Sequence, residues 1–222
     1  MSSLLYINLV PSSDQDAFAQ KVTDTAAALQ CDPNWLMQVM KAESGLRPDI
    51  QNTTYPLHNG YATGLIQFTP DTAASLGTTT DDLKQMSRVE QMDWVYKYFS
   101  PYIGQLNSYF AIYLVTFFPA AISHVDDDTY IFQTGNIAAS SIARSNPTID
   151  INGDGQITMA EFKQYVQNSV QQQYWDQIFT NPTAVVVEVV KNNILMVIII
   201  AVVVTGIAFA IIQINNKKVI NN

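Results

Sequence analysis

A glutamate near the end of a predicted helix is the first candidate for chemistry in this chain. Glu43 is followed directly by Ser44 and Gly45, and the segment 64–73 reads Gly-Leu-Ile-Gln-Phe-Thr-Pro-Asp-Thr-Ala. A carboxyl group at a helix terminus that packs against aromatic side chains loses hydration, which raises its pKa towards neutral pH. Such a group can protonate a leaving oxygen. A helix-end glutamate is by itself usually an ordinary carboxylate, so the prediction of a catalytic acid depends on the combined pattern.

Oxygen-bearing side chains recur at regular intervals further along the chain, in residues 150–161. Loop positions 1, 3, 5, 7, 9 and 12 are Asp150, Asn152, Asp154, Gln156, Thr158 and Glu161. Gly155 stands at position 6, where the chain must turn sharply, and this is the spacing of an EF-hand loop. Gln156 would contribute its backbone carbonyl, and Glu161 would close the shell with both carboxylate oxygens. The loop predicts one Ca²⁺ ion with a structural role, because no second hand is present; the alternative is an Asx-rich turn that caps the next helix.

The spacing of apolar residues predicts that helices position these groups. The expected helices cover residues 14–29, 33–44, 88–100 and 108–118. Asp32 can cap the second helix and Gly45 can end it, while Ser87 and Glu90 have the spacing of a capping box. The fourth helix is almost entirely apolar and is expected at the centre of the core. Because no long alternating run occurs, a substantial sheet is not expected, and the fold class is all-α.

These residues give the chain a resemblance to the soluble lytic transglycosylase family, enzymes of the lysozyme fold. The family signatures are a Glu-Ser-Gly helix end and a Gly-Leu-(Met/Ile)-Gln segment that leads into Pro-x-Thr-Ala. The resemblance spans residues 14–171. It is closest to a phage subgroup whose domain continues through a Pro-Ala-Ala segment, here residues 119–121, into a calcium-loop-like stretch.

The resemblance implies cleavage of the β-1,4 bond between N-acetylmuramic acid and N-acetylglucosamine in peptidoglycan. Glu43 would be the general acid and then the base. A single carboxylate would suffice, because the acetamido group of the substrate stabilises the oxocarbenium-like centre and the C6 hydroxyl closes a 1,6-anhydro ring. Ser44 and Gln67 match family positions that orient the glutamate and the sugar. The usual scheme with two carboxylates would then not apply.

One family motif is absent. Most members carry Ala-Tyr-Asn near the end of the central helix, whereas residues 115–119 read Val-Thr-Phe-Phe-Pro, and Phe117 stands where the tyrosine is expected. Tyrosines that could take its place are Tyr61, Tyr109, Tyr113 and Tyr130. Of these, Tyr61 and Tyr113 are predicted to bind substrate. Two alternatives stay open: a hydrolytic muramidase of the goose-lysozyme kind, and a catalytically inactive structural protein of a virion membrane.

A long apolar run near the C-terminus predicts a membrane anchor. Residues 194–212 contain no charge and would span about 28 Å as a helix, close to the thickness of a bilayer core. Lys191 and the pair at 217–218 bracket the run. The expected organisation is an N-terminal segment (1–13), a lysozyme-like domain (14–135), the EF-hand-like segment (136–178), a stalk (179–193), a transmembrane helix (194–214) and a tail (215–222).

Charge and composition limit the classes of partner that this protein is expected to bind. Without the three lysines that flank the anchor, eight basic side chains stand against 19 acidic ones, so the surface repels polyanions and nucleic acid is not an expected partner. The expected partners are therefore peptidoglycan, the bilayer, and capsid or other virion proteins. The expected location is a bacteriophage virion membrane, with the bacterial inner membrane as the alternative. The single cysteine, Cys31, is expected to be buried and unreactive, and the run 126–128 to be a solvated turn.

Overall fold

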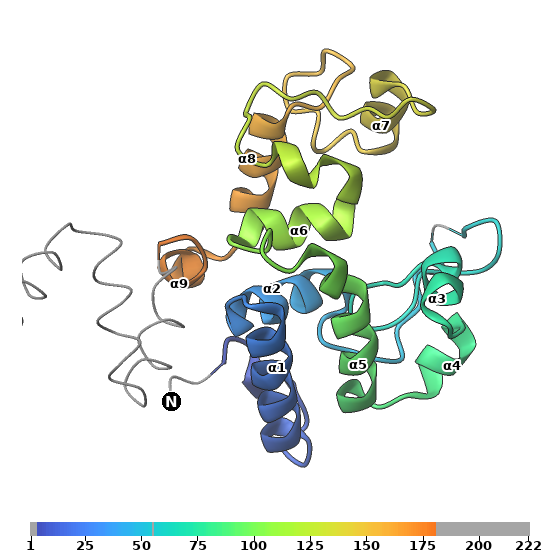
Figure 1. Ribbon diagram of the computed structural model, residues 1–222, viewed down its shortest axis with the longest axis vertical. Helices are drawn as coiled ribbons and strands as arrows, with labels where there is room; N and C mark the ends of the chain where they lie inside the picture. The colour runs from blue at the N-terminus through green and yellow to red at the C-terminus, as the bar shows by residue number, and fades with distance from the viewer. Residues whose placement is uncertain (1–3, 55, 181–222) are drawn as a thin grey trace, which may run out of the picture. The chain divides into compact units, whose positions relative to one another are not determined.

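The computed structural model describes residues 4–54 and 56–180 (Figure 1). This part of the chain belongs to one compact unit of helices, in which only isolated β-bridges and no sheet occur. The α-helices are α1 (Gln15–Leu29), α2 (Pro33–Ser44), α3 (Pro70–Leu76), α4 (Thr80–Gln85), α5 (Arg88–Phe99), α6 (Tyr109–Phe117), α7 (Ala139–Ser145), α8 (Met159–Ser169) and α9 (Trp175–Phe179). Short 3-10 helices are η1 (Ile7–Leu9), η2 (Ser100–Tyr102), η3 (Pro119–His124) and η4 (Gln172–Tyr174). The prediction of a mostly helical chain is confirmed.

The predicted membrane helix at 194–214, its tail and nearly all of the predicted stalk lie outside the described residues. Among residues 4–54 and 56–180, no helix has both the length and the apolar character needed to cross a bilayer.

The predicted helix ends agree with the structure because local hydrogen bonds set them. The Asp32 carboxylate accepts a hydrogen bond from the backbone N–H of Asn34 at 2.8 Å, and Gly45 ends α2 with a φ of 63°. At the start of α5, Ser87 and Glu90 satisfy each other's backbone N–H groups as a capping box. Such interactions depend only on neighbouring residues, which is why the sequence alone identifies them.

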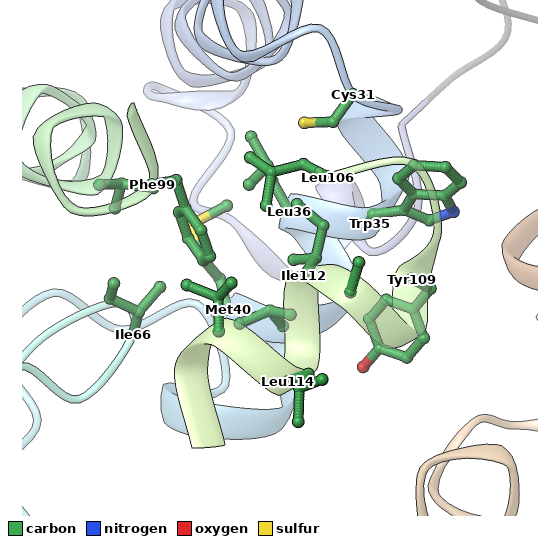
Figure 2. Close-up of a cluster of buried hydrophobic side chains, with 14 of the residues drawn as sticks. Cys31, Trp35, Leu36, Met40, Ile66, Phe99, Leu106, Tyr109, Ile112 and Leu114 are labelled. Carbon is green, nitrogen blue, oxygen red and sulfur yellow. The ribbon is translucent and has the colours of Figure 1, made fainter. Parts of the chain in front are cut away.

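Helix α6 lies at the centre of the packing, as its apolar sequence predicts. Ile112 and Leu114 of α6 are fully buried, and Figure 2 shows Ile112 beside Leu36 of α2, in a cluster that also holds Met40 of α2 and Phe99 of α5. Helix α1 packs against both α2 and α5, and α6 packs against α2 and α8. The three helices α2, α5 and α6 thus share one core, and their ends are fixed relative to each other.

The chain after the central helix packs back onto the same core. The helix α8 lies against α6 through Phe162, whose ring is 5.5 Å from the ring of Phe117. Helix α9 lies against α2, where the indole N–H of Trp35 donates a hydrogen bond to the backbone oxygen of Ile178 at 3.0 Å. Residues that follow the central helix are therefore part of the same packed unit.

Two smaller predictions are confirmed by the burial and the contacts of the described residues. Cys31 is a buried free thiol, and burial raises its pKa to about 12, so the reactive thiolate is suppressed. The run 126–128 is an exposed turn, in which Asp127 accepts hydrogen bonds from Thr129 and Asp128 pairs with Lys163 at 2.7 Å.

The cap of α2 provides a first test of this account of the fold. Asp32→Ala should lower the free energy of unfolding by about 1 kcal/mol, because the N–H of Asn34 loses its acceptor. Asp32→Asn keeps an acceptor at the same position and should stay close to wild type. Denaturant unfolding of both variants measures the difference, and equal losses in the two would show that the carboxylate does not act as a cap.

Candidate active site

The glutamate predicted to be catalytic lies in the last turn of α2, where the helix meets the aromatic side chains of α5 and α6. Its side chain is half-buried, and no hydrogen bond reaches its carboxylate within the described part of the chain. Burial alone raises the pKa of Glu43 to about 7. A carboxyl group with this pKa is protonated in part at neutral pH, so it can give up a proton and take one back under the same conditions.

Three tyrosines surround Glu43. Tyr98 of α5 and Tyr109 and Tyr113 of α6 lie close enough for the negative charge of Glu43 to raise the pKa of each hydroxyl, in addition to the larger effect of burial. The Tyr98 hydroxyl donates to the backbone oxygen of Val115 at 2.8 Å. The Tyr109 hydroxyl is buried beside Gln38 and has no hydrogen-bond partner among the described residues. The aromatic surroundings predicted for Glu43 are thus confirmed, with neutral tyrosines as neighbours.

Ser44 connects the end of α2 to the second sequence motif. Its hydroxyl is buried and lies 2.9 Å from the backbone oxygens of both Met40 and Leu65, which share its proton. Because the side chain is occupied by these two carbonyl groups, it fixes the position of the neighbouring glutamate relative to the segment that contains Leu65. Ser44 therefore has a structural role next to Glu43, in which it joins the end of α2 to the segment that contains Leu65.

Gln67 lies in a tight turn formed by residues 63–68. Thr63 and Phe68 exchange backbone hydrogen bonds at 2.9 and 3.0 Å, and Gln67 itself has a left-handed φ of 53°. Its side-chain amide donates to the backbone oxygen of Gly64 at 3.0 Å and, more weakly, to that of Ile50 at 3.4 Å. The side chain is half-buried and closes the turn from the inside.

A buried glutamine that the sequence analysis missed holds this turn against α5. Gln91 accepts a hydrogen bond from the backbone N–H of Leu65 at 2.9 Å and donates to the backbone oxygens of Pro48 and Leu83, both at 2.6 Å. It is fully buried on the apolar face of α5. The sequence signal that could have identified Gln91 is a glutamine on a helix face whose other residues are apolar. Tyr98, seven residues later in α5, lies on the same face.

The remaining tyrosines predicted to be near the site do not gather around Glu43. The ring of Tyr61 is 36% exposed, and no described contact joins it to Glu43 or to its three neighbouring tyrosines. Tyr130 stacks on His124, with ring centroids 4.1 Å apart. Tyr113 is therefore the predicted substrate-binding tyrosine that lies at the glutamate, and Tyr98 is the neighbour that was not predicted.

The side chains of the acidic loop at 150–161 accept hydrogen bonds from the loop's own backbone. The carboxylate of Asp150 accepts from the N–H groups of Gly153 and Gly155 at 2.9 and 3.0 Å, and Gly155 has a left-handed φ of 82°. Glu161 accepts from the N–H groups of Asn152 and Thr158 at 3.2 and 2.9 Å, so it connects both ends of the loop. Burial opposes the charge of Glu161, but these hydrogen bonds prevail and lower its pKa.

The loop places oxygen atoms from neutral side chains and backbone carbonyls beside its carboxylates, which is the donor chemistry that Ca²⁺ prefers. No group of three or more His, Cys, Asp or Glu side chains suited to a metal occurs among the described residues. Ile157 at loop position 8 is fully buried, and its carbonyl accepts a hydrogen bond from the N–H of Phe132 at 2.9 Å. The strand-like partner of this loop is therefore the segment around residues 130–132.

Comparison with protein families gives a match to the transglycosylase SLT domain over residues 21–113, which is less than half of the chain. This stretch contains α2 with Glu43, the turn at 63–68, α5, and the first half of α6 as far as Tyr113. No curated protein and no solved structure matches the chain. The match indicates an enzyme, a lytic transglycosylase that acts on peptidoglycan, and it agrees with the mostly helical fold.

Two glycines test the role of Gln91. A Cβ added to Gly64 would lie 2.5 Å from Gln91 Oε1, whereas one added to Gly77 meets nothing within 4 Å, and both residues have left-handed φ values, +82° and +86°. Gly77→Ala should therefore cost only the conformational penalty of about 1–2 kcal/mol. Gly64→Ala should cost an additional ~1–3 kcal/mol, because Gln91 must leave its partners unpaired. Denaturant unfolding that gives equal losses would contradict the role of Gln91.

Proposed function

We propose that Glu43 is the single catalytic residue of this peptidoglycan lytic transglycosylase and that the enzyme releases 1,6-anhydro products. The observation that carries the proposal is a carboxyl group with a pKa of about 7 within the SLT-type region, near Tyr98, Tyr109 and Tyr113. Its pKa shift has one cause, burial, with no contribution from a second carboxylate in the described chain. One residue is therefore assigned both proton transfers.

In the first step Glu43 donates its proton to the oxygen of the β-1,4 bond between N-acetylmuramic acid and N-acetylglucosamine. The C1–O bond breaks, its electron pair stays on the departing oxygen, and the acetamido group of the muramic acid residue stabilises the oxocarbenium-like centre. In the second step the Glu43 carboxylate removes the proton from the C6 hydroxyl, whose oxygen bonds to C1. The glutamate ends protonated, so no water and no outside proton are consumed.

The surroundings of Glu43 suit these two steps. A site walled by tyrosines withholds water from the carboxyl group, which keeps its proton available near neutral pH. Ser44 and Gln91 fix the end of α2 and the turn that carries Gln67. The residues assigned to the sugar would therefore be preorganised before it binds. Gln67 and the half-exposed ring of Tyr113 are the groups assigned to the sugar, and Tyr61 is assigned to a more distant part of the glycan strand.

The location proposed for the enzyme is the membrane of a bacteriophage virion, where it would open the cell wall during entry. The support is the apolar run at 194–212, which carries no charge, together with the phage-type order of a Pro-Ala-Ala segment followed by the acidic loop. The anchor would hold the enzyme at a bilayer, near peptidoglycan and near capsid or other virion proteins. The bacterial inner membrane is the alternative location.

We also assign a structural Ca²⁺ ion to the loop at 150–161. Asp150, Asn152, Asp154, Thr158 and Glu161 would contribute side-chain oxygens, and Gln156 its backbone carbonyl. The support is the ligand spacing together with a backbone that already turns sharply at Gly155. When bound, the ion would neutralise the acidic loop and fix the start of α8.

Replacing the acid tests the catalytic proposal. Glu43→Gln should lower the rate of peptidoglycan solubilisation by about 10²- to 10⁴-fold, or roughly 3 to 5 kcal/mol of barrier, while the melting temperature stays close to wild type. The wild-type rate should fall as the pH rises above about 7, because the acid loses its proton there. Asp126→Asn removes an exposed charge and should be neutral. Retained activity in Glu43→Gln would exclude the assignment.

The same digests distinguish the two modes of cleavage by mass spectrometry. Anhydro ends are lighter than reducing ends by one water molecule, so reducing ends would identify a hydrolytic muramidase instead of the proposed lyase. A folded wild-type protein that releases no fragments at any pH would support the inactive structural alternative.

Removal of the ion tests the calcium assignment. A chelator should lower the melting temperature of the wild-type protein, with a loss of roughly 2.7 kcal/mol if Ca²⁺ was present at about one hundred times its dissociation constant. Asp150→Ala should abolish this response, whereas Asp126→Ala removes the same charge from an exposed turn and should retain it. A melting temperature that does not respond to chelator in the wild-type protein would exclude a bound ion.

A further inference from the structure

The segment 46–50 joins the helix end that carries Glu43 to the turn that carries Gln67. It begins directly after the end of α2. At its other end the backbone oxygen of Ile50 accepts a hydrogen bond from the N–H of Gly64 at 2.9 Å and a longer one from the Gln67 amide at 3.4 Å. The segment is therefore bonded to both elements of the proposed site.

The backbone of this segment is held in an unusual conformation. Leu46 has a φ of 65° directly after Gly45, whose φ is 63°, and bulky side chains rarely adopt left-handed values. Leu46 is 2% exposed, and its N–H donates to the backbone oxygen of Met40 at 3.2 Å. Two residues later, the backbone oxygen of Pro48 accepts from the buried Gln91 at 2.6 Å. Burial and these bonds fix the path by which the chain leaves α2.

Two charged side chains lie on the outside of the segment. Arg47 and Asp49 are exposed, whereas Leu46 is buried and Pro48 and Ile50 are half-buried. The guanidinium of Arg47 lies 3.6 Å from the carboxylate of Asp49, and the two side chains are 58% and 61% exposed. An ion pair this open to water is weak, so the guanidinium can exchange Asp49 for another carboxylate.

Arg47 differs in this respect from the other lysines and arginines of the SLT-type region. Lys41 is closer to Glu43 in the sequence, but two residues differ by roughly 200° around a helix, so it lies on the other side of α2. Among the described residues, the ion pair of Arg47 is also the longest. The remaining cations of the region have close partners: Lys21 with Asp93, Lys84 with Gln51, Arg88 with Asp14, and Lys97 with the ring of Trp94.

A carboxylate of the peptide stem is the ligand that suits this position. The sugars of peptidoglycan are uncharged where the lactyl group of N-acetylmuramic acid carries a stem, so the free carboxylates of the stem are the anionic groups of the strand. A chain with 19 acidic and 11 basic side chains repels such groups in general. An exposed guanidinium offsets this locally, because it can bind a carboxylate through two parallel hydrogen bonds.

We propose that Arg47 binds a carboxylate of the peptide stem on N-acetylmuramic acid and thereby makes peptide-bearing strands the preferred substrate. The inference rests on the proposed function of Glu43 at the adjoining helix end. The stem displaces Asp49 from the guanidinium, so Asp49 competes with the substrate. A guanidinium beside the acid would lower the pKa of Glu43, whereas burial is the one cause of its shift. Arg47 therefore acts on binding and leaves proton transfer to Glu43.

The test compares the full-length wild-type protein with Arg47→Ala on two substrates: untreated peptidoglycan, and peptidoglycan whose carboxyl groups have been converted to amides. On the untreated substrate, KM should rise about three- to tenfold in Arg47→Ala while kcat stays near wild type, because a binding interaction is lost. On the amidated substrate the two proteins should have the same KM. Arg144→Ala removes an exposed arginine from α7 as the matched control and should behave as wild type on both substrates.

Replacing the competitor should change KM in the opposite direction. Asp49→Asn frees the guanidinium, so KM on untreated peptidoglycan should fall about two- to threefold. This gain should vanish when Arg47→Ala is also present, because the freed group is then absent. A gain that persists in the double variant would show that Asp49 acts without Arg47 and would count against the competition.

Binding without cleavage separates this inference from the catalytic proposal. In a Glu43→Gln background, adding Arg47→Ala should lower the fraction of full-length protein that sediments with untreated peptidoglycan, but not with amidated peptidoglycan. An unchanged KM in Arg47→Ala, or an equal rise on both substrates, would overturn the inference. If Glu43→Gln remains active, the proposed function fails instead, and the comparison of the two substrates still decides the role of Arg47.

Discussion

The removal of water from the Glu43 carboxyl group is the constraint on which the rest of the site depends. A glutamate in water is ionised at neutral pH and has no proton to give to a glycosidic oxygen. In this protein the ends of α2, α5 and α6 converge on the side chain, and burial raises its pKa to about 7. Burial raises the pKa of the tyrosines near this side chain, so they are uncharged at neutral pH and supply no charge that would stabilise the anion.

The residues that hold this site in place are polar, and their side-chain groups are fully hydrogen-bonded. Ser44 bonds backbone oxygens on α2 and on the neighbouring turn, and Gln91 pairs three backbone groups from three different segments. An unpaired polar group in the same place would cost about 1–3 kcal/mol. The two residues therefore fix the position of the glutamate relative to the turn that carries Gln67.

The parts of this arrangement that depend on local interactions were predictable from the sequence, and those that depend on tertiary packing were not. The cap at Asp32, the capping box at Ser87 and the stop at Gly45 involve neighbouring residues, so the ends of α2 and α5 agree with prediction. The position of Glu43 at the end of α2 could be predicted because the motif is local, whereas Tyr109 and Tyr113 of α6 were named only as candidates suggested by the family resemblance. Tyr98 and Gln91 were missed because their roles depend on which face of α5 meets the turn.

The segment after the SLT-type region shows the same distinction. The spacing of the loop at 150–161 predicts its sharp turn at Gly155, and the structure agrees. Nothing in the spacing indicates that the loop pairs with residues 130–132, or that α8 brings Phe162 to Tyr113 and Phe117. Those contacts join residues that are far apart in the sequence, and only the packing of α8 on α6 reveals them.

The central claim is that burial gives Glu43 a pKa near neutrality, and carbon NMR of protein labelled at the glutamate carboxyl carbons measures this directly. Comparison with Glu43→Gln identifies the resonance. The account predicts that the Glu43 signal titrates at about pH 7 and that the signal of the exposed Glu90 titrates below the ordinary value for glutamate. A Glu43 signal that titrates at the ordinary value for a glutamate in water would contradict the account.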